Sequence, residues 1–259
     1  MRLSSVDLGQ ADTLDDGERQ RAASFGSGIQ RDRFLAGRIA LRRHAAETAG
    51  MGAAQLPAEY VCRECTRDDR VHGMPRYQVG PSGPAVLASL SQAGDWCLLA
   101  ATTDERVLGV GVDLEGSTAA GFDGFGLIAL SEREREHLQR VQPALRPSFQ
   151  TLLWTRKEAV LKALGRGLAA VDPALVDVAG PVPLLPGFLQ APSAPSVTGV
   201  PLMGVAQTGV PLATGMAQAD CLEASGHGWL VDTVDPESVG LPDSFTAAIA
   251  LHGTPGPFA

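Results

Sequence analysis

The chain has 259 residues and a net charge of −8, with 44% hydrophobic and 19% charged residues. This composition is typical of a globular protein and excludes a disordered chain, and the length is sufficient for one large domain or two small ones. The acidic balance argues against a general nucleic-acid-binding protein, although a local basic surface stays possible.

Targeting and membrane signals are absent from the sequence pattern. The first twenty residues contain no continuous apolar stretch, and no window supplies the roughly 18 uninterrupted apolar residues that a membrane span needs. Four cysteines in a chain of this length do not indicate a disulfide scaffold. We therefore expect a soluble, cytoplasmic protein that contacts no membrane.

The first predicted element is a helix over 31–50, where apolar residues recur three and four apart before Gly50 ends the pattern. Its polar face is mainly arginine. The segment 18–43 holds two acids and seven arginines, so it could meet an anion or form a solvated helix face. These arginines are Arg19, Arg21, Arg31, Arg33, Arg38, Arg42 and Arg43.

A loop and two strands follow the first helix. Cys62, Cys65 and His72 in the loop would supply three zinc ligands, but a structural zinc site needs four and no fourth is evident nearby. Strands are predicted over 95–102 and 106–115, separated by a short polar turn.

The second half of the chain begins with two predicted helices. Ser131 and Glu134 have the spacing of a capping box, and a longer helix runs from about Pro147 to Gly165. A segment over 180–215 with seven prolines is expected to be a loop-like insert that is dispensable to catalysis. Two strands, "GWLVDTVD" and "DSFTAAIALHG", close the chain. Because "GDWCLLAA" is echoed by "DSFTAAIA", the chain could consist of two similar halves, or the match could be chance.

Two acids, Asp113 and Glu115, lie at the end of the strand "GVGVDLEG". Residues two apart in a strand share a face, so these carboxylates are neighbours and repel each other. Solvent, a basic side chain or a hard divalent cation such as Mg²⁺ would offset this repulsion.

The strand "GVGVDLE", followed about forty residues later by the helix "WTRKEAVLK", resembles the 4′-phosphopantetheinyl transferase superfamily. Weaker similarities are "RFLAGRIALR" to the family's first helix, "HGMPRY" to its HGKP loop, "SLSQAGDW" to its FNxSHxGxW segment and "FTAAIA" to its last strand. The length is similar to that of the larger, monomeric, surfactin-synthetase-activating type.

This resemblance implies an α+β fold of two pseudo-symmetric halves, each with a helix packed on an antiparallel sheet, and an active site in the cleft between them. The N-terminal half would span 1–108 and the C-terminal half 109–259. It also implies that apolar residues after Glu115, such as Phe122 and Phe125, lie near the surface that binds the carrier protein.

The implied reaction transfers the 4′-phosphopantetheine group of coenzyme A to a serine of an apo acyl or peptidyl carrier protein, releasing adenosine 3′,5′-bisphosphate. Mg²⁺ would be held by Asp113, Glu115 and Glu158, and would stabilise charge that develops on the leaving phosphate. Glu158 or a metal-bound water would take the serine proton, while Lys162 would contact the pyrophosphate. Without the strand motif, Glu158 and Lys162 would be interpreted as an ordinary i, i+4 helix pair.

The resemblance further implies a set of coenzyme-binding residues: Arg33, Arg31, Arg76, Ser91, Gln92, Asp113, Lys157 and Lys162. Lys157 or Lys162 would also balance the carboxylates. Two positions depart from the family pattern, because Gln92 replaces its histidine and Met74 replaces the lysine of its HGKP loop. A competing interpretation is a degenerate module that binds coenzyme A or a carrier protein without turnover.

Overall fold

The computed structural model describes residues 1–61, 73–80, 83–168, 170–189 and 228–254. Cys62, Cys65 and His72 lie outside the described residues, as do residues 190–215 of the predicted insert. Residues 180–189, which were expected to begin that insert, include buried Leu189, and Val182 and Leu185 pack against the core of the C-terminal half.

The N-terminal part of the chain places one long helix on an antiparallel sheet. Ser27 accepts a hydrogen bond from the backbone of Gln30 at the start of α2, and Gly50 ends that helix with a φ of 66°. The buried face of α2 packs on β3 and β4. The sheet order is β1-β2-β3-β4, and the elements are α1 (Asp16–Ala23), α2 (Gly28–Ala49), β1 (Ala58–Val61), β2 (Met74–Gln78), β3 (Ala85–Ala93) and β4 (Trp96–Thr102).

The C-terminal part repeats this plan with a smaller sheet of order β5-β7-β6. Helix α5 packs on β5 and β7 around a core that includes Leu153, Val160 and Ala248. The elements are β5 (Val107–Gly116), α3 (Phe125–Ala129), α4 (Glu132–Arg140), α5 (Arg146–Ala163), β6 (Trp229–Val234) and β7 (Phe245–Gly253).

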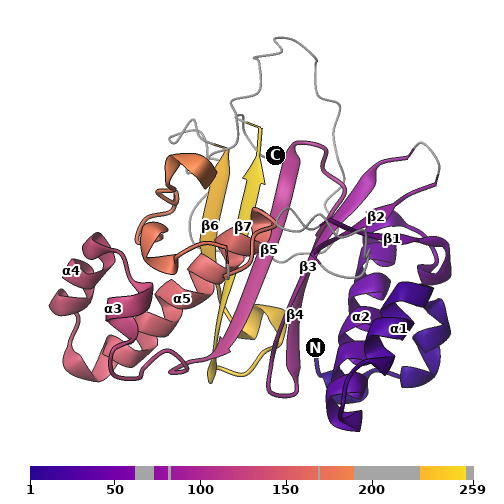
Figure 1. Cartoon of the computed structure of the whole chain (residues 1–259), viewed down its shortest axis with the longest axis horizontal. Coiled ribbons are helices and arrows are strands. Elements are labelled where there is room, and N and C mark those ends of the chain that lie inside the picture. The colour runs from indigo at the N-terminus through magenta and orange to yellow at the C-terminus, as the bar shows by residue number, and fades with distance from the viewer. Residues whose placement is uncertain (62–72, 81–82, 169, 190–227, 255–259) are drawn as a thin grey trace.

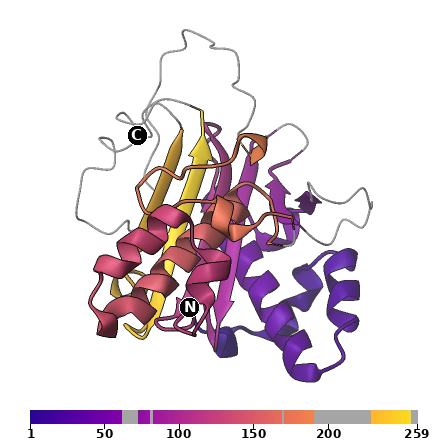
Figure 2. The same ribbon diagram turned by 60° about the vertical axis from the view of Figure 1, so that its left-hand side comes forward.

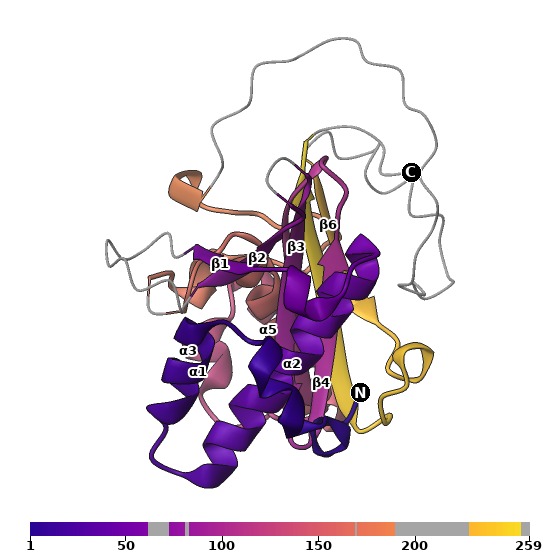
Figure 3. The same cartoon turned by 90° about the vertical axis from the view of Figure 1, so that its right-hand side faces the viewer.

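The two sheets meet where β3 lies beside β5. The Ser89 hydroxyl of β3 accepts a hydrogen bond of 3.0 Å from the backbone N–H of Val112 in β5. Figure 1 shows the strands in the middle, with α1 and α2 on the right and α3 to α5 on the left. Figure 2 brings α3 to α5 to the front. In Figure 3 the other side of the molecule faces the viewer, and α2 lies in front of the strands.

Short 3₁₀ helices connect these elements. They are η1 (Leu3–Ser5), η2 (Leu8–Thr13), η3 (Ala53–Gln55), η4 (Pro143–Leu145), η5 (Pro173–Leu175), η6 (Gly187–Leu189) and η7 (Glu237–Val239). None of the helices in the described part of the chain combines the length and the hydropathy of a membrane span.

The predicted α+β class is confirmed, as are both long helices, the strands at 95–102 and 106–115, and the two closing strands. The capping box is also confirmed, since Ser131 and Glu134 exchange side-chain and backbone hydrogen bonds at the start of α4. Strands β1, β2 and β3 and the short helices α1 and α3 were not predicted.

Candidate functional site

Two glycines of β5 allow α5 to approach the strand at backbone contact. A Cβ atom at Gly109 would lie 1.9 Å from the carbonyl oxygen of Ala163, and one at Gly111 would lie 1.9 Å from that of Ala159. No side chain fits there, so the motif "GVGVD" needs glycine on the face that α5 covers. This close packing brings the polar residues of α5 beside the acids of β5.

Asp113, Lys162 and Ser91 form a hydrogen-bonded cluster at this contact. Lys162 Nζ lies 2.7 Å from Asp113 Oδ1 and also donates to Ser91 Oγ at 3.1 Å and to the Val112 carbonyl at 3.2 Å. The Ser91 hydroxyl donates to the same Asp113 Oδ1 at 2.8 Å. Asp113 is only 3% exposed, so this pair lies in a poorly solvated environment where charge interactions are strong.

The second carboxylate oxygen of Asp113, Oδ2, is buried and has no hydrogen-bond partner among the described residues. Glu158 and Glu115 lie close enough to interact electrostatically with it. Burial, and then the charge of Asp113, raise the pKa of Glu158 to about 7, with Glu115 adding to the shift and Lys162 opposing it. Burial and Asp113 also raise the pKa of Glu115. The region therefore holds more negative charge than Lys162 neutralises.

The donor chemistry of this region fits a hard divalent cation, which prefers carboxylate oxygens and would satisfy the unpartnered Asp113 Oδ2. The side chains are not gathered into a finished ligand set. Within the described residues, no three His, Cys, Asp or Glu side chains lie close enough together to hold a metal ion. Glu115 and Glu158 would have to turn toward Oδ2 to complete one.

A cavity of about 360 Å³ opens beside Lys162, where the two sheets meet. It is lined from both halves of the chain, and the charged residues that line it in the described part of the chain are all basic. The lining residues are Arg38, Gly73, Met74, Pro75, Ala88, Ser89, Leu90, Lys162, Gly165, Arg166 and Gly167. A cavity with this lining is suited to an anionic ligand.

Lys157 does not join this cluster, contrary to the expectation that it could balance the carboxylates, and its expected contact with coenzyme A stays a prediction. Its side chain is fully buried, lies 2.6 Å from Glu134 Oε2, and donates to the carbonyls of Pro173 and Val176. Burial lowers the pKa of Lys157, and the neighbouring Glu134 opposes that shift. Because residues one apart in a helix point in different directions, Lys157 faces α4 while Glu158 faces the Asp113 region.

Arg33 and Gln92 bind each other across the contact between α2 and β3. Arg33 Nε donates to Gln92 Oε1 at 3.3 Å, and Gln92 Nε2 donates to the Arg33 carbonyl at 3.4 Å. Gly37 makes room for this contact, because a Cβ atom there would lie 2.1 Å from Gln92 Nε2. The amide of Gln92 thus lies against α2, and its expected contact with a 3′-phosphate stays a prediction.

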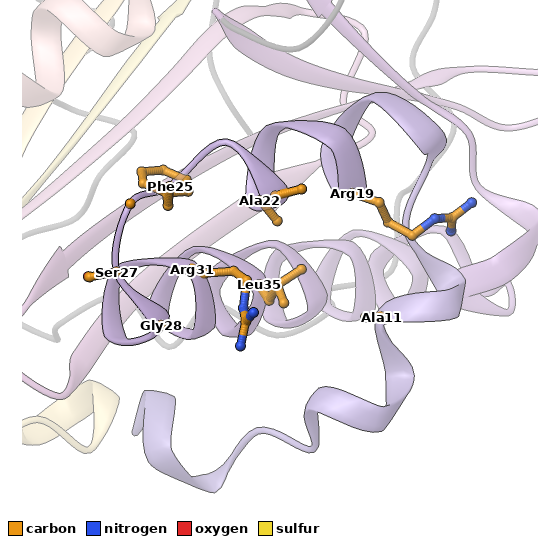
Figure 4. A pocket seen from close by; sticks show the side chains of 10 residues that line it. Ala11, Arg19, Ala22, Phe25, Ser27, Gly28, Arg31 and Leu35 are labelled. Carbon is orange, nitrogen blue, oxygen red and sulfur yellow. The ribbon is translucent and has the colours of Figure 1, made fainter.

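Arg31 lines a different cavity, of about 510 Å³, between α1 and α2. Figure 4 shows Arg31 and Leu35 on α2 and Arg19 and Ala22 on α1 at this cavity. Arg31 is also paired with Asp32 at 3.1 Å. Arg31 is not among the residues that line the cavity beside Lys162, although Arg38 of the same helix is.

Arg76 is exposed on β2, whereas its neighbours Met74 and Pro75 line the cavity beside Lys162. Sequence reasoning did not select Arg38 or Arg166, the two other basic residues of that cavity. Arg38 belongs to the arginine-rich segment but was not distinguished within it. Arg166 carried no signal beyond its place between two glycines after α5.

The fold and the site together define an α+β protein with a carboxylate-lysine cluster beside a basic cavity. Residues 109–181, which span β5 to α5, match the family model of the 4′-phosphopantetheinyl transferase superfamily. No curated protein matches the chain.

Two solved structures are similar to part of the chain. One is a holo-(acyl-carrier-protein) synthase from Bacillus anthracis str. Ames in complex with CoA (3′,5′-ADP), with 15% identity and a TM-score of 0.36 over 57% of this chain and 97% of that chain. The other is the holo-[acyl-carrier-protein] synthase of Thermotoga maritima, with 17% identity and a TM-score of 0.33 over 57% of this chain and 64% of that chain.

Proposed function

We propose that this protein transfers the 4′-phosphopantetheine group of coenzyme A to a serine of an apo acyl or peptidyl carrier protein. The observation that carries the proposal is the cluster of Asp113 and Lys162 beside Glu115 and Glu158, formed by the segment that matches the transferase superfamily. We further propose that it is a monomer of the surfactin-synthetase-activating type and acts in the cytoplasm.

The basic cavity beside Lys162 supports coenzyme A as the substrate. Its pyrophosphate would lie near Lys162, which can exchange one of its present acceptors for a phosphate oxygen, and Arg38 and Arg166 provide further positive charge. Arg33, Arg31, Arg76, Ser91 and Gln92 stay candidates for contacts with the rest of the coenzyme, and Lys157 is a weaker candidate because its side chain is fully buried.

The bond changes assign roles to two residues of α5. The serine oxygen of the carrier attacks the phosphorus that bears the pantetheine arm, the bond from that phosphorus to the bridging oxygen breaks, and adenosine 3′,5′-bisphosphate leaves. Glu158 would accept the serine proton, and a carboxylate with a pKa near 7 is well matched to that task. Lys162 would stabilise the charge on the phosphate oxygens.

We propose Asp113, Glu115 and Glu158 as the residues that would hold Mg²⁺. The support is the unpartnered Oδ2 of Asp113 and the mutual repulsion that raises the pKa values of Glu115 and Glu158. When bound, Mg²⁺ would supply stabilisation of negative charge on the pyrophosphate.

The test is incubation of the protein with an apo carrier protein, coenzyme A and Mg²⁺, followed by the mass of the carrier. Carriers from fatty acid, polyketide and peptide synthesis should be compared, since no residue of the site identifies the pathway. The expected result is a carrier that gains one phosphopantetheine group, and a Glu158→Gln variant is the matched control that should lose this gain.

A binding module without turnover is the second candidate. It is favoured by the arrangement of the acids, since no three side chains among the described residues are gathered for a metal ion. Coenzyme A binding in calorimetry with no mass gain on any carrier would support this candidate over the transferase.

A further inference from the structure

The Ser91 side chain stands between the two charged groups of the candidate site. Its hydroxyl donates to Asp113 Oδ1 at 2.8 Å and accepts from Lys162 Nζ at 3.1 Å. Ser91 is 8% exposed and comes from β3, whereas Asp113 and Lys162 come from β5 and α5. Ser91 therefore connects the sheet β1-β2-β3-β4 to the pair of Asp113 and Lys162.

The hydrogen bonds leave Ser91 and Lys162 without a free donor. A serine hydroxyl has one proton, and that of Ser91 goes to Asp113. A lysine ammonium has three protons, and those of Lys162 go to Ser91 Oγ, the Val112 carbonyl and Asp113 Oδ1. A direct contact from the Ser91 hydroxyl to a coenzyme phosphate would require it to leave Asp113.

The same bonds determine which oxygen of Asp113 is available. Oδ1 accepts hydrogen bonds from both Ser91 and Lys162, and Oδ2 is buried without a hydrogen-bond partner among the described residues. An anchored Oδ1 restricts rotation of the carboxylate, so Oδ2 keeps a fixed direction.

We propose that Ser91 is a positioning residue that orients Asp113 and Lys162, so that Asp113 Oδ2 is presented to a divalent cation. This inference rests on the cation site of the proposed function, and it gives Ser91 a role in that site in addition to the coenzyme contact proposed above.

The experiment measures binding of Mn²⁺ to the whole protein by the electron paramagnetic resonance signal of the free ion, with and without saturating coenzyme A. Ser91→Ala should weaken Mn²⁺ binding by about ten-fold, since residues that orient a metal ligand typically contribute 10- to 100-fold to affinity. Ser91→Thr keeps a hydroxyl and should restore at least half of the lost affinity on a logarithmic scale.

Ser89→Ala is the matched control. Ser89 is on the same face of β3 and is also buried, at 5% exposure, but its hydroxyl accepts from the Val112 backbone and does not contact Asp113 or Lys162. Ser89→Ala should therefore lower the urea midpoint of unfolding as much as Ser91→Ala does, while Mn²⁺ affinity measured without coenzyme A stays within two-fold of the wild type.

Three results would overturn the proposal. The first is an equal loss of Mn²⁺ affinity in Ser89→Ala and Ser91→Ala. The second is an unchanged Mn²⁺ affinity in Ser91→Ala together with weaker binding of coenzyme A in the absence of metal, and the third is no Mn²⁺ binding by the wild type. The proposed transferase activity fails separately. If Mn²⁺ binds with the expected dependence on Ser91 but no carrier gains mass, the positioning role stands and the transferase assignment falls.

Discussion

Lys162 Nζ is 2.7 Å from Asp113 Oδ1, whereas Glu115 and Glu158 add unneutralised negative charge to the same region. Removal of each of the three carboxylates should therefore have a different effect on the unfolding free energy. Asp113 is held by favourable charge-assisted hydrogen bonds. Burial and like charge raise the pKa values of the other two, so their ionised forms are disfavoured.

Substitution of the acids should separate stability from activity. Asp113→Ala should lower Mg²⁺-dependent transfer by a factor on the order of 10² or more and cost about 1–3 kcal/mol of unfolding free energy, because Lys162 loses its partner. Glu115→Ala should lower transfer without loss of stability, because it relieves repulsion. Carrier mass over time and urea unfolding measure the two effects. Near-normal turnover of Asp113→Ala at limiting Mg²⁺ would contradict the site assignment.

The pKa of Glu158 predicts a pH-dependent stability in EDTA. The pKa of the Glu158 carboxyl is about 7 in the folded chain and about 4.5 in the unfolded chain. Between these two values the folded chain holds the proton more tightly, so the unfolding free energy should fall as pH rises through this interval and then level off. Glu158→Gln cannot ionise and should be more stable than the wild type at pH 8, by about 1–2 kcal/mol after solvent screening, but not at pH 4. Urea unfolding at several pH values measures the difference.

Added Mg²⁺ provides the control for this pH dependence. The cation competes with the proton for Glu158, so its stabilising effect on the wild type should be larger at pH 8 than at pH 6. A stability difference between Glu158→Gln and the wild type that is the same at every pH would contradict the pKa shift.

Gly111 should be intolerant of any side chain. A Cβ atom there would meet the Ala159 carbonyl oxygen at 1.9 Å and the Ala163 nitrogen at 2.6 Å, both of them backbone atoms of α5. Gly111→Ala should thus cost about 3 kcal/mol of unfolding free energy and lower transfer, because it displaces α5 from β5. Gly116→Ala, at the end of the same strand with nothing within 4 Å, is the control and should change stability by no more than about 0.5 kcal/mol.

Lys157 should contribute to stability and not to coenzyme binding. Lys157→Met leaves Glu134 as a buried charge without its partner and should cost about 3–5 kcal/mol. The KM for coenzyme A should stay within two-fold of the wild type at a temperature where the variant is folded. Lys162→Met, on the same helix, should instead raise the KM for coenzyme A, and it should also lose stability because it leaves buried Asp113 without its charged partner. A ten-fold rise of KM in Lys157→Met with unchanged stability would indicate that Lys157 contacts the coenzyme.

Carrier binding should depend on apolar contacts around α3. Phe122, Leu127 and Ile128 are 55%, 78% and 65% exposed, and Phe122 and Ile128 line a cavity of about 280 Å³ that reaches Glu115. Phe125, also expected at this surface, is buried in the core and packs against Trp154. Ile128→Ser, at an exposed residue that lines this cavity, should raise the KM for the carrier by about ten-fold while the KM for coenzyme A stays unchanged.

Leu184→Ser is the control for this surface, since Leu184 is 55% exposed but does not line that cavity. Binding should also change less than two-fold between low and moderate salt, because apolar contacts are not screened. A steep loss of carrier affinity with salt would indicate docking by charge.

The sequence predicts the elements that have strong local signals. The spacing of apolar residues and Gly50 locate α2, the Ser131 and Glu134 capping box locates the start of α4, and the alternation in "GVGVDLEG" places Asp113 beside Glu115. Each of these signals lies within a few residues of the element that it describes.

The parts of the site that were missed depend on contacts between distant residues. Lys157 was assigned to the coenzyme from the family resemblance, and its pairing with Glu134 on another helix was not foreseen, because a capping box gives no sign of a second, long-range contact. Ser91 was assigned to phosphate from the same resemblance, and its hydrogen bond to Asp113 was not foreseen, because β3 was not predicted as a strand next to β5. Local patterns thus identify the candidate residues, whereas tertiary packing determines which of them meet.

The sheets β1-β2-β3-β4 and β5-β7-β6 share no strand ladder, and side chains such as Ser89 and Ser91 connect them at the contact of β3 with β5. A ligand in the cavity beside Lys162 would touch both sides of this contact. Its binding energy then depends on the two halves being folded and docked at the same time, which couples their unfolding. Coenzyme A, the substrate that we propose, should therefore make thermal unfolding more cooperative as well as raise its midpoint, because it would contact both sheets.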